Sequence, residues 1–227
     1  ANAKYSQDHL PVKEQNTAEG HAVRATYLYC AMADLAYEYN DEQLLNCCSN
    51  IFNDIVTKKM YITGGIGSSY TESFTIDYDL PNITAYSESC AAVGLSLFAG
   101  RMLNIDIDSC YSDVIERIIY NVLLSGVSLD GESFFYENPL EVIPSLLTRD
   151  TSTNKQWIHF PATQRSGVFA CSCCPPNILR FISSIGNSIY THDDSTVFVH
   201  QYIASDANFE IGDKNIQIIQ QTDYPNN

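Results

Sequence analysis

Three cysteines lie within four residues of one another in the segment Cys171-Ser-Cys-Cys-Pro-Pro-Asn177. Proline is favoured in the first turn of a helix, so Pro175 and Pro176 predict that Cys173 and Cys174 lie at a helix N-terminus. The positive end of a helix dipole favours the thiolate form of cysteine. The ordinary alternative is buried, inert cysteine. The clustering of thiols at one helix entry favours a nucleophilic or metal-binding role instead.

A second candidate is Glu88-Ser-Cys90, which also leads into a predicted helix. Glu88 and Cys90 could supply one carboxylate and one thiolate, and with Cys173 and Cys174 they would complete a four-coordinate zinc site. Taken alone, the pattern is weak evidence and favours the ordinary alternative, a solvated glutamate beside a small buried cysteine. Since more than eighty residues separate the two segments, the sequence leaves their contact open.

Composition argues against several classes of function. The formal net charge is −15, from 27 acidic and 12 basic residues, so nucleic-acid binding, which needs clustered Lys and Arg, is not expected. The longest apolar run is shorter than the ~20 residues of a membrane helix, and no secretory leader is visible. Eight cysteines that include adjacent pairs do not resemble a disulfide framework. The sequence therefore predicts a cytoplasmic protein that associates with no membrane.

Helical periodicity dominates the elements that must position these residues. Helices are expected in five segments, Ala22–Tyr39, Glu42–Lys59, Ser89–Leu103, the stretch from Asp113 through Val122, and Ile178–Ile189. Beyond about Tyr190 the residues become β-branched and aromatic, which predicts strands at Ser195–Ala204 and Gln217–Gln221. A short strand is also expected at Phe134–Tyr136. The fold class is therefore mainly α, with the first strands of a β domain at its end.

Two long stretches lack helical periodicity, Tyr61–Thr84 and Asn138–Gly167. Loops of this length in a compact domain are more often functional than accidental. The Gly64-Gly65-Ile-Gly67 segment lacks the preceding strand of a dinucleotide-binding motif. We expect these glycines to let the first loop turn tightly instead.

Seven motifs together resemble glycoside hydrolase family 127, whose characterised activity is β-L-arabinofuranosidase. The motifs run in order from about His9 to Ile203 and are Glu19-Gly-His-Ala-Val-Arg24, Met60-Tyr-Ile-Thr-Gly-Gly-Ile-Gly-Ser68, Tyr78-Asp-Leu-Pro-Asn82, Ala85-Tyr-Ser-Glu-Ser-Cys90, Tyr111-Ser-Asp-Val-Ile-Glu-Arg117, Leu129-Asp-Gly131 and Cys171-Ser-Cys-Cys-Pro-Pro-Asn177. The resemblance implies an (α/α)6 toroid barrel followed by a β-sandwich. It covers only the second half of that barrel, here residues 1–192, and the start of the sandwich, here residues 193–227.

The same resemblance implies the roles of individual residues. It assigns Cys173 as the nucleophile and Glu72 as the general acid/base of a retaining glycosidase that acts on terminal β-L-arabinofuranosides. His21 and Tyr136 match positions that contact the sugar. The implied zinc ligands are Glu88, Cys90, Cys173 and Cys174.

Two departures from the family pattern bear on these roles. Thr71 stands where relatives commonly have Gly before the acid/base Glu, which affects the shape of the loop. The N-terminal half of the barrel, which would supply further sugar contacts, is missing. We therefore expect residues 1–227 alone to be inactive and to expose apolar helix faces.

The physical chemistry of the implied zinc site is informative. Two positive charges on zinc and four negative ligands leave a formal charge of −2, and all four positions are filled by protein, as in a structural site. Such a centre could be catalytic only if a ligand itself reacts, and a zinc-held thiolate is already deprotonated. The alternative hypothesis is a helical domain with a purely structural zinc, which binds carbohydrate or protein without hydrolysis.

Overall fold

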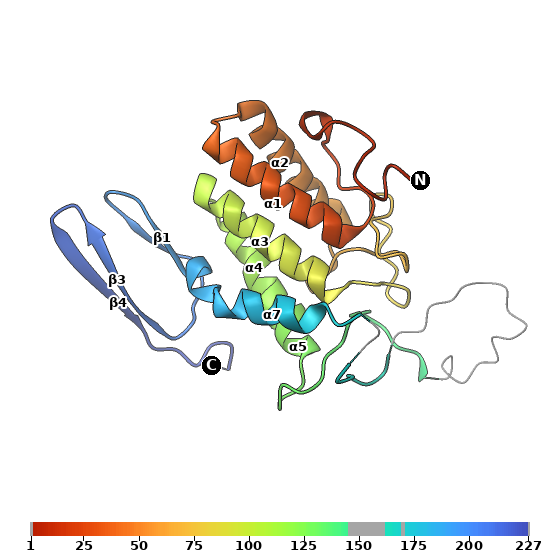
Figure 1. The fold of residues 1–227 in the computed structure, drawn as a ribbon. Helices are drawn as coiled ribbons and strands as arrows, with labels where there is room; N and C mark the ends of the chain where they lie inside the picture. The colour runs from red at the N-terminus through yellow and green to blue at the C-terminus, as the bar shows by residue number, and fades with distance from the viewer. Residues whose placement is uncertain (1, 145–161, 169–170, 227) are drawn as a thin grey trace, which may run out of the picture.

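Helices form most of the regular structure in a computed structural model that describes residues 2–144, 162–168 and 171–226 (Figure 1). The α-helices are α1 (Ala22–Glu38), α2 (Glu42–Asp54), α3 (Ser89–Ile105), α4 (Ser109–Ile118), α5 (Leu124–Gly126) and α7 (Cys174–Ser183). Single π-helical turns at Ile55–Lys59 and Ile119–Leu123 extend α2 and α4. Short 3-10 turns lie at Val12–Glu14 and Ile185–Ser188. The predicted mainly helical class is confirmed.

Two helix boundaries differ from the prediction. Helix α4 begins at Ser109, before Asp113, because the Asp108 side chain caps it by accepting a hydrogen bond from Cys110 N at 2.8 Å. Helix α7 begins at Cys174, with proline in its first turn as predicted, but it ends at Ser183. Of the apolar residues that continue the pattern, Ile185 lies in the following 3-10 turn and Ile189 comes directly after it.

The strands form two antiparallel hairpins. Strand β1 (Tyr190–His192) pairs with β2 (Val197–Val199), and β3 (Ser205–Ile211) pairs with β4 (Lys214–Gln220), with Phe209 opposite Ile216. The predicted strand Ser195–Ala204 is therefore shorter. Strand β3 was not predicted, because Asp and Asn, which are depleted in strands, interrupt its pattern.

Of two further segments predicted to be non-helical, one can be compared with the structure in full and the other only in part. The strand expected at Phe134–Tyr136 is wrong: Phe134 forms only isolated bridges, to Val127 and to Ser166. Most of the predicted loop Asn138–Gly167 lies outside the described residues.

Helix α3 is the centre of the helical part and packs against α1, α4 and α7. It is buried on nearly all sides because its sequence is rich in small and apolar residues, including Ala91, Ala92 and Gly94. Such an apolar helix belongs to a protein core here: none of the helices in the described ranges has the length and composition needed to cross a bilayer.

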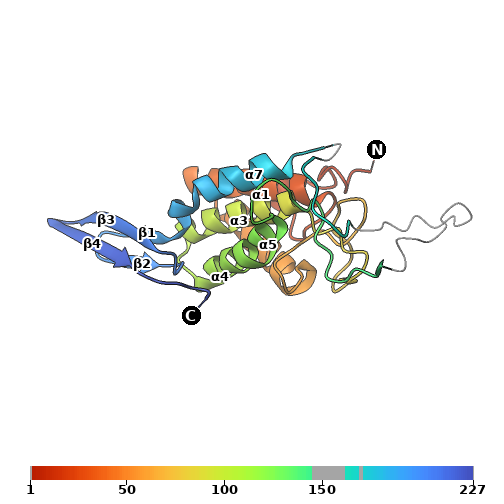
Figure 2. The same ribbon diagram turned by 90° about the horizontal axis from the view of Figure 1, so that it is seen from below.

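The elements sort to two ends of the molecule. The hairpins project from one end of the helices, and the long connecting segments gather at the other (Figures 1 and 2). The N-termini of α1, α3 and α7 lie at the end opposite the hairpins, together with the loop at residues 61–84 (Figure 1). This end therefore holds the residues that the sequence analysis singled out.

A buried ion pair anchors the chain just before α1. Lys59 and Asp54 are 6% and 4% exposed, and their Nζ and Oδ2 atoms lie 2.9 Å apart. Both also hold the backbone of Ala18: Asp54 Oδ2 accepts from Ala18 N, and Lys59 Nζ donates to Ala18 O, each at 2.9 Å. Each partner of the pair thus also makes a hydrogen bond to the backbone, which helps to offset the cost of burying the charges. It fixes the entry to α1.

Helix α7 presents apolar side chains to solvent. Leu179 and Ile182 are 66% and 42% exposed, and with Leu124 and Phe134 they line a hollow of about 370 Å³. None of the candidate catalytic or metal-binding residues lines this hollow, although Pro175, the neighbour of Cys174, does. Exposed apolar helix faces are expected from the sequence, and α7 carries one within the described residues.

We expect Gly94→Ala to destabilise the fold, because a Cβ atom at Gly94 would lie 2.1 Å from Thr26 Oγ1 of the packed helix α1. Overpacking of this kind costs about 1–3 kcal/mol of unfolding free energy. Gly100 lies in the same helix with nothing within 4 Å of its would-be Cβ, so Gly100→Ala should be stabilising by up to about 1 kcal/mol. Chemical denaturation of both variants tests this, and equal stabilities would contradict the described α1–α3 packing.

Candidate metal centre and active site

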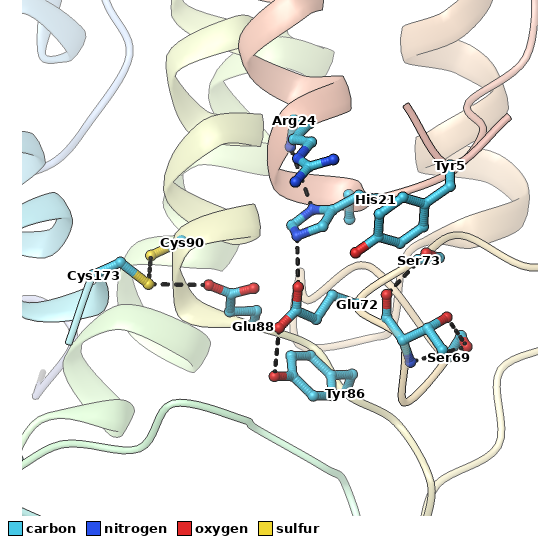
Figure 3. A network of polar contacts seen from close by, with 12 residues as sticks. Tyr5, His21, Arg24, Ser69, Glu72, Ser73, Tyr86, Glu88, Cys90 and Cys173 are labelled. Carbon is cyan, nitrogen blue, oxygen red and sulfur yellow. Dashed lines mark hydrogen bonds and ion pairs between the residues drawn. The ribbon is translucent and has the colours of Figure 1, made fainter. Parts of the chain in front are cut away.

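Three helix N-termini place candidate residues at one location (Figure 3). His21 is the N-cap residue of α1, Glu88 that of α3 and Cys173 that of α7. The Glu88 side chain makes no capping bond to its own helix, and it points toward Cys173 instead (Figure 3). Since the positive ends of α3 and α7 face this point, negative ligand atoms are favoured there.

The four predicted metal ligands converge. Oxygen or sulfur atoms of Glu88, Cys90, Cys173 and Cys174 all lie within 4.8 Å of one another. Cys90 Sγ is 3.2 Å from Cys173 Sγ and 3.6 Å from Cys174 Sγ, and Cys173 Sγ is 3.4 Å from Glu88 Oε1. The eight cysteines are all free thiols. The sequence could not decide whether these segments meet, and the structure brings them together.

The donor set fits a tetrahedral zinc ion. Zinc–sulfur bonds of about 2.3 Å at tetrahedral angles require sulfur–sulfur separations of about 3.8 Å, and the three observed separations, 3.2, 3.6 and 4.0 Å, bracket this value. Glu88 is 3% exposed, and Cys90 and Cys174 are 0% exposed. Among the residues that the structure describes, the buried Glu88 Oε2 finds no hydrogen-bond partner. A buried carboxylate oxygen without a donor needs a counter-charge, which a divalent cation would supply.

The pKa values of Glu88, Cys90 and Cys173 in the cluster are raised, and a bound cation would lower them. Burial raises the pKa of the Glu88 carboxyl and of the Cys173 thiol. The pKa of Cys90 is raised by its hydrogen bond to Cys174 and then by burial. A bound cation would reverse these directions, because it stabilises the charged form of every ligand.

Glu72 lies next to this cluster, in the loop that connects the π-helical turn after α2 to α3 (Figure 3). Its Oε2 is 2.6 Å from His21 Nε2, and its Oε1 accepts a hydrogen bond from the Tyr86 hydroxyl at 3.0 Å. Both carboxylate oxygens are therefore held. The backbone of Glu72 has φ +62°, a left-handed conformation that is costly for a non-glycine residue and that clusters at functional sites.

Glycines let the Glu72 loop turn tightly, as predicted, and they also let it approach the start of α3. Gly67 has φ +84°, and its carbonyl accepts a hydrogen bond from Ser87 N at 2.9 Å. A Cβ atom at Gly65 would lie 1.8 Å from Ser87 Oγ, so no larger residue fits there without a shift. The close approach places Glu72 and Glu88 side by side (Figure 3).

Tyr136 also reaches the cluster. Its hydroxyl oxygen lies 3.5 Å from Cys173 Sγ, and its ring packs edge-on against Tyr86 at 6.1 Å between centroids. Burial raises the pKa of Tyr136, so its hydroxyl keeps its proton at neutral pH and can donate a hydrogen bond. The candidate catalytic, sugar-contacting and metal-binding residues thus all lie in or against the metal cluster and the adjoining Glu72 group, whereas the exposed Cys171 lies outside the metal cluster.

Sequence reasoning did not single out two residues of this site. Tyr86 contacts Glu72, and Asn177 Nδ2 donates to Cys90 Sγ at 3.1 Å. Both stand inside motifs that also contain candidate residues, two positions before Glu88 and three positions after Cys174. Proximity to a ligand along the chain was the available signal, but it does not say which neighbour points inward.

Comparison with known proteins agrees with this geometry. Residues 1–187 match the family model for the β-L-arabinofuranosidase GH127 catalytic domain. A non-reducing end β-L-arabinofuranosidase of Bifidobacterium longum subsp. longum is 41% identical over 224 residues, which are 97% of this chain and 33% of that protein.

Solved structures give the same relation. The crystal structure of a GH127 β-L-arabinofuranosidase from Geobacillus stearothermophilus T6 is 47% identical with a TM-score of 0.89, over 98% of this chain and 34% of that chain. A second GH127 β-arabinofuranosidase is 42% identical with a TM-score of 0.85, over 98% of this chain and 32% of that chain.

The chain spans about a third of the length of these relatives. The match to the family model nevertheless covers all six α-helices described above and ends just before the first hairpin. This chain belongs to the glycoside hydrolase family 127 β-L-arabinofuranosidase catalytic-domain family.

Proposed function

We propose that this chain forms part of the catalytic domain of a retaining glycoside hydrolase that releases terminal β-L-arabinofuranosyl residues. The observation that carries the proposal is the convergence of one carboxylate and three thiols within 4.8 Å, with Glu72 beside them (Figure 3). The names of the relatives, all arabinofuranosidases, support the substrate class. Zinc is the proposed metal, with Glu88, Cys90, Cys173 and Cys174 as its ligands.

Cys173 is the proposed nucleophile because it is the accessible member of the cluster. Cys90 and Cys174 are fully buried, whereas Cys173 is half-buried and lies beside the Tyr136 hydroxyl. Zinc, when bound, would keep the thiols deprotonated at neutral pH. A thiolate is the form of cysteine that attacks carbon.

The proposed reaction has two displacements. Cys173 Sγ forms a bond to the anomeric carbon of the sugar while the glycosidic carbon–oxygen bond breaks, and Glu72 gives its proton to the leaving oxygen. Water then attacks the same carbon, Glu72 takes a proton from that water, and the carbon–sulfur bond breaks. Two inversions retain the configuration, as in glycosidases with a carboxylate nucleophile.

His21, which lies beside Glu72, and Tyr136, which lies beside Cys173, are proposed to contact the sugar. His21 Nδ1 accepts a hydrogen bond from Arg24 N at 3.5 Å, so its proton is placed on Nε2, which faces Glu72 Oε2. This arrangement lets His21 hold Glu72 in one orientation.

We further propose that residues 1–192 form part of an (α/α)6 toroid and that residues 193–227 begin a β-sandwich. The packed helices α1–α4 and α7 support the first part, and the two hairpins support the second. Strands β1 and β2 pair across the proposed boundary, so paired strands rather than a free linker would join the two parts. A cytoplasmic location is proposed from the eight free thiols.

Zinc should bind with a stoichiometry of one ion per chain, and its affinity should fall as the pH falls. Burial raises the pKa of Glu88 and of Cys173, so more ligands are protonated in the metal-free protein at lower pH, and zinc must displace those protons. We expect the affinity to fall by about tenfold or more per pH unit. Competition with a chromophoric chelator between pH 6 and 8 measures this. A pH-independent affinity would contradict the proposed ligand set.

Cys173→Ser should lower kcat by about 10³-fold or more, because a serine hydroxyl is a far weaker nucleophile at neutral pH than a metal-held thiolate. The assay measures hydrolysis of an aryl β-L-arabinofuranoside. It uses the full-length natural protein that contains this chain. Cys171→Ser is the matched control, since Cys171 is exposed and lies outside the metal-binding group. Full activity of Cys173→Ser would rule out the nucleophile. Zinc binding by wild type without hydrolysis of any glycoside would favour the structural-zinc alternative.

Glu72→Gln should lower kcat by about 10²–10⁴-fold, the usual contribution of general acid–base catalysis, while zinc content stays unchanged. The loss in the first step should be smaller for substrates with good leaving groups, because these need no proton. A series of substituted aryl glycosides measures this dependence on the leaving group. Glu132→Gln, at an exposed loop position, serves as the control. If the variant lost activity equally for all leaving groups in pre-steady-state measurements, Glu72 would not be the acid.

A further inference from the structure

We propose that Asn177 is a positioning residue of the metal centre, which donates its side-chain amide to Cys90 Sγ and thereby leaves Cys173 as the reactive sulfur. The inference rests on the proposed metal site and concerns how its three thiolates are made unequal. Asn177 Nδ2 lies 3.1 Å from Cys90 Sγ. It is shorter than the contacts of Cys173 Sγ with Glu88 Oε1 and with the Tyr136 hydroxyl, at 3.4 and 3.5 Å.

The orientation of this amide is determined by its other neighbours. Asn177 Oδ1 accepts hydrogen bonds from the Tyr27 hydroxyl and from Arg180 Nη2, each at 3.0 Å. A guanidinium group has donors and no acceptor, so it can only face the amide oxygen. The amide nitrogen must therefore face Cys90. The assignment of oxygen and nitrogen, which is otherwise ambiguous for asparagine, follows from Arg180.

Arg180 is itself held in place. Its guanidinium lies over the Tyr27 ring, 5.4 Å from the ring centroid, and Arg180 Nη2 also donates to the Tyr27 hydroxyl. Tyr27 comes from α1, whereas Arg180 and Asn177 come from α7 one turn apart. The three side chains thus link two helices and end on a ligand that belongs to a third helix, α3.

The cluster needs such a donor. Zinc with three thiolates and one carboxylate carries a formal charge of −2, and Cys90 is 0% exposed, so water cannot solvate its sulfur. A buried negative group is stabilised by hydrogen-bond donors. Outer donors of this kind orient metal ligands and tune them.

The donor also makes the sulfur atoms unequal. Cys90 Sγ receives the amide at 3.1 Å, whereas the hydroxyl oxygen of Tyr136 is 3.5 Å from Cys173 Sγ. A hydrogen bond withdraws electron density from the sulfur that accepts it. Cys90 is thus both buried and the less electron-rich thiolate, and Cys173, which is half-buried, keeps its nucleophilicity.

The test compares zinc and cobalt binding by the chain and its variants. Asn177→Ala should weaken zinc binding by about 10–100-fold, the usual effect of removing an outer partner of a metal ligand. It should also move the thiolate-to-cobalt charge-transfer band to longer wavelength, because Cys90 becomes more electron-rich. Asn177→Asp keeps the shape but turns an acceptor toward Cys90, so zinc affinity should fall further. Asn104→Ala, at an exposed position of α3, should match wild type in both measurements.

The outcomes separate the two proposals. If wild type binds neither zinc nor cobalt, the proposed metal site fails. If wild type binds both, and Asn177→Ala and Asn177→Asp match it in affinity and in spectrum, the role of Asn177 is overturned. Should circular dichroism show that the Asn177 variants do not fold, Arg180→Met replaces them, since Arg180 is exposed. Arg180→Met frees the Asn177 amide to rotate, so the charge-transfer band of bound cobalt should shift to longer wavelength, as expected for Asn177→Ala. An unchanged band would overturn the inference.

Discussion

The candidate metal centre and active site depend on the meeting of three helix N-termini at one end of the helical part. A cluster of thiolates and a carboxylate is costly to bury, because each charged group loses its hydration when it is buried. At this point the N-caps of α3 and α7 are themselves candidate ligand residues, Glu88 and Cys173, and the partial positive charge of each helix start compensates part of the cost. Helix α3 makes the meeting possible, because it packs against both α1 and α7.

The candidate site combines three buried candidate ligands with one accessible candidate ligand. Complete coordination by protein normally marks a structural metal site, and the burial of Glu88, Cys90 and Cys174 agrees with that. The difference lies in Cys173, which remains half-buried beside Tyr136 and near the Glu72 group. Under the proposed function, the metal's ligands would therefore serve two purposes: three hold the ion in place, and the fourth reacts.

Positioning of Glu72 draws on parts of the chain that are distant from one another. Its carboxylate is held between His21 and Tyr86, and its loop is brought close by Gly65 and Gly67, which lie against Ser87. The entry to α1, and so the place of His21, depends on the buried pair of Asp54 and Lys59. The strained backbone of Glu72 persists because these contacts over-determine it.

Local sequence was enough to predict the helical class, a helix start at the cysteine–proline motif and the tight turns of the Glu72 loop, because periodicity, proline and glycine act over a few neighbouring residues. Motifs that resemble family 127 also predicted the candidate residues, though not their contacts. The meeting of Glu88 and Cys90 with Cys173 and Cys174 could not be predicted in this way, since pairing across more than eighty residues depends on how α3 and α7 pack. The same holds for Asn177 and Tyr86: which side chain turns toward a sulfur or a carboxylate is set by neighbours from other helices, such as Tyr27, that local sequence does not encode.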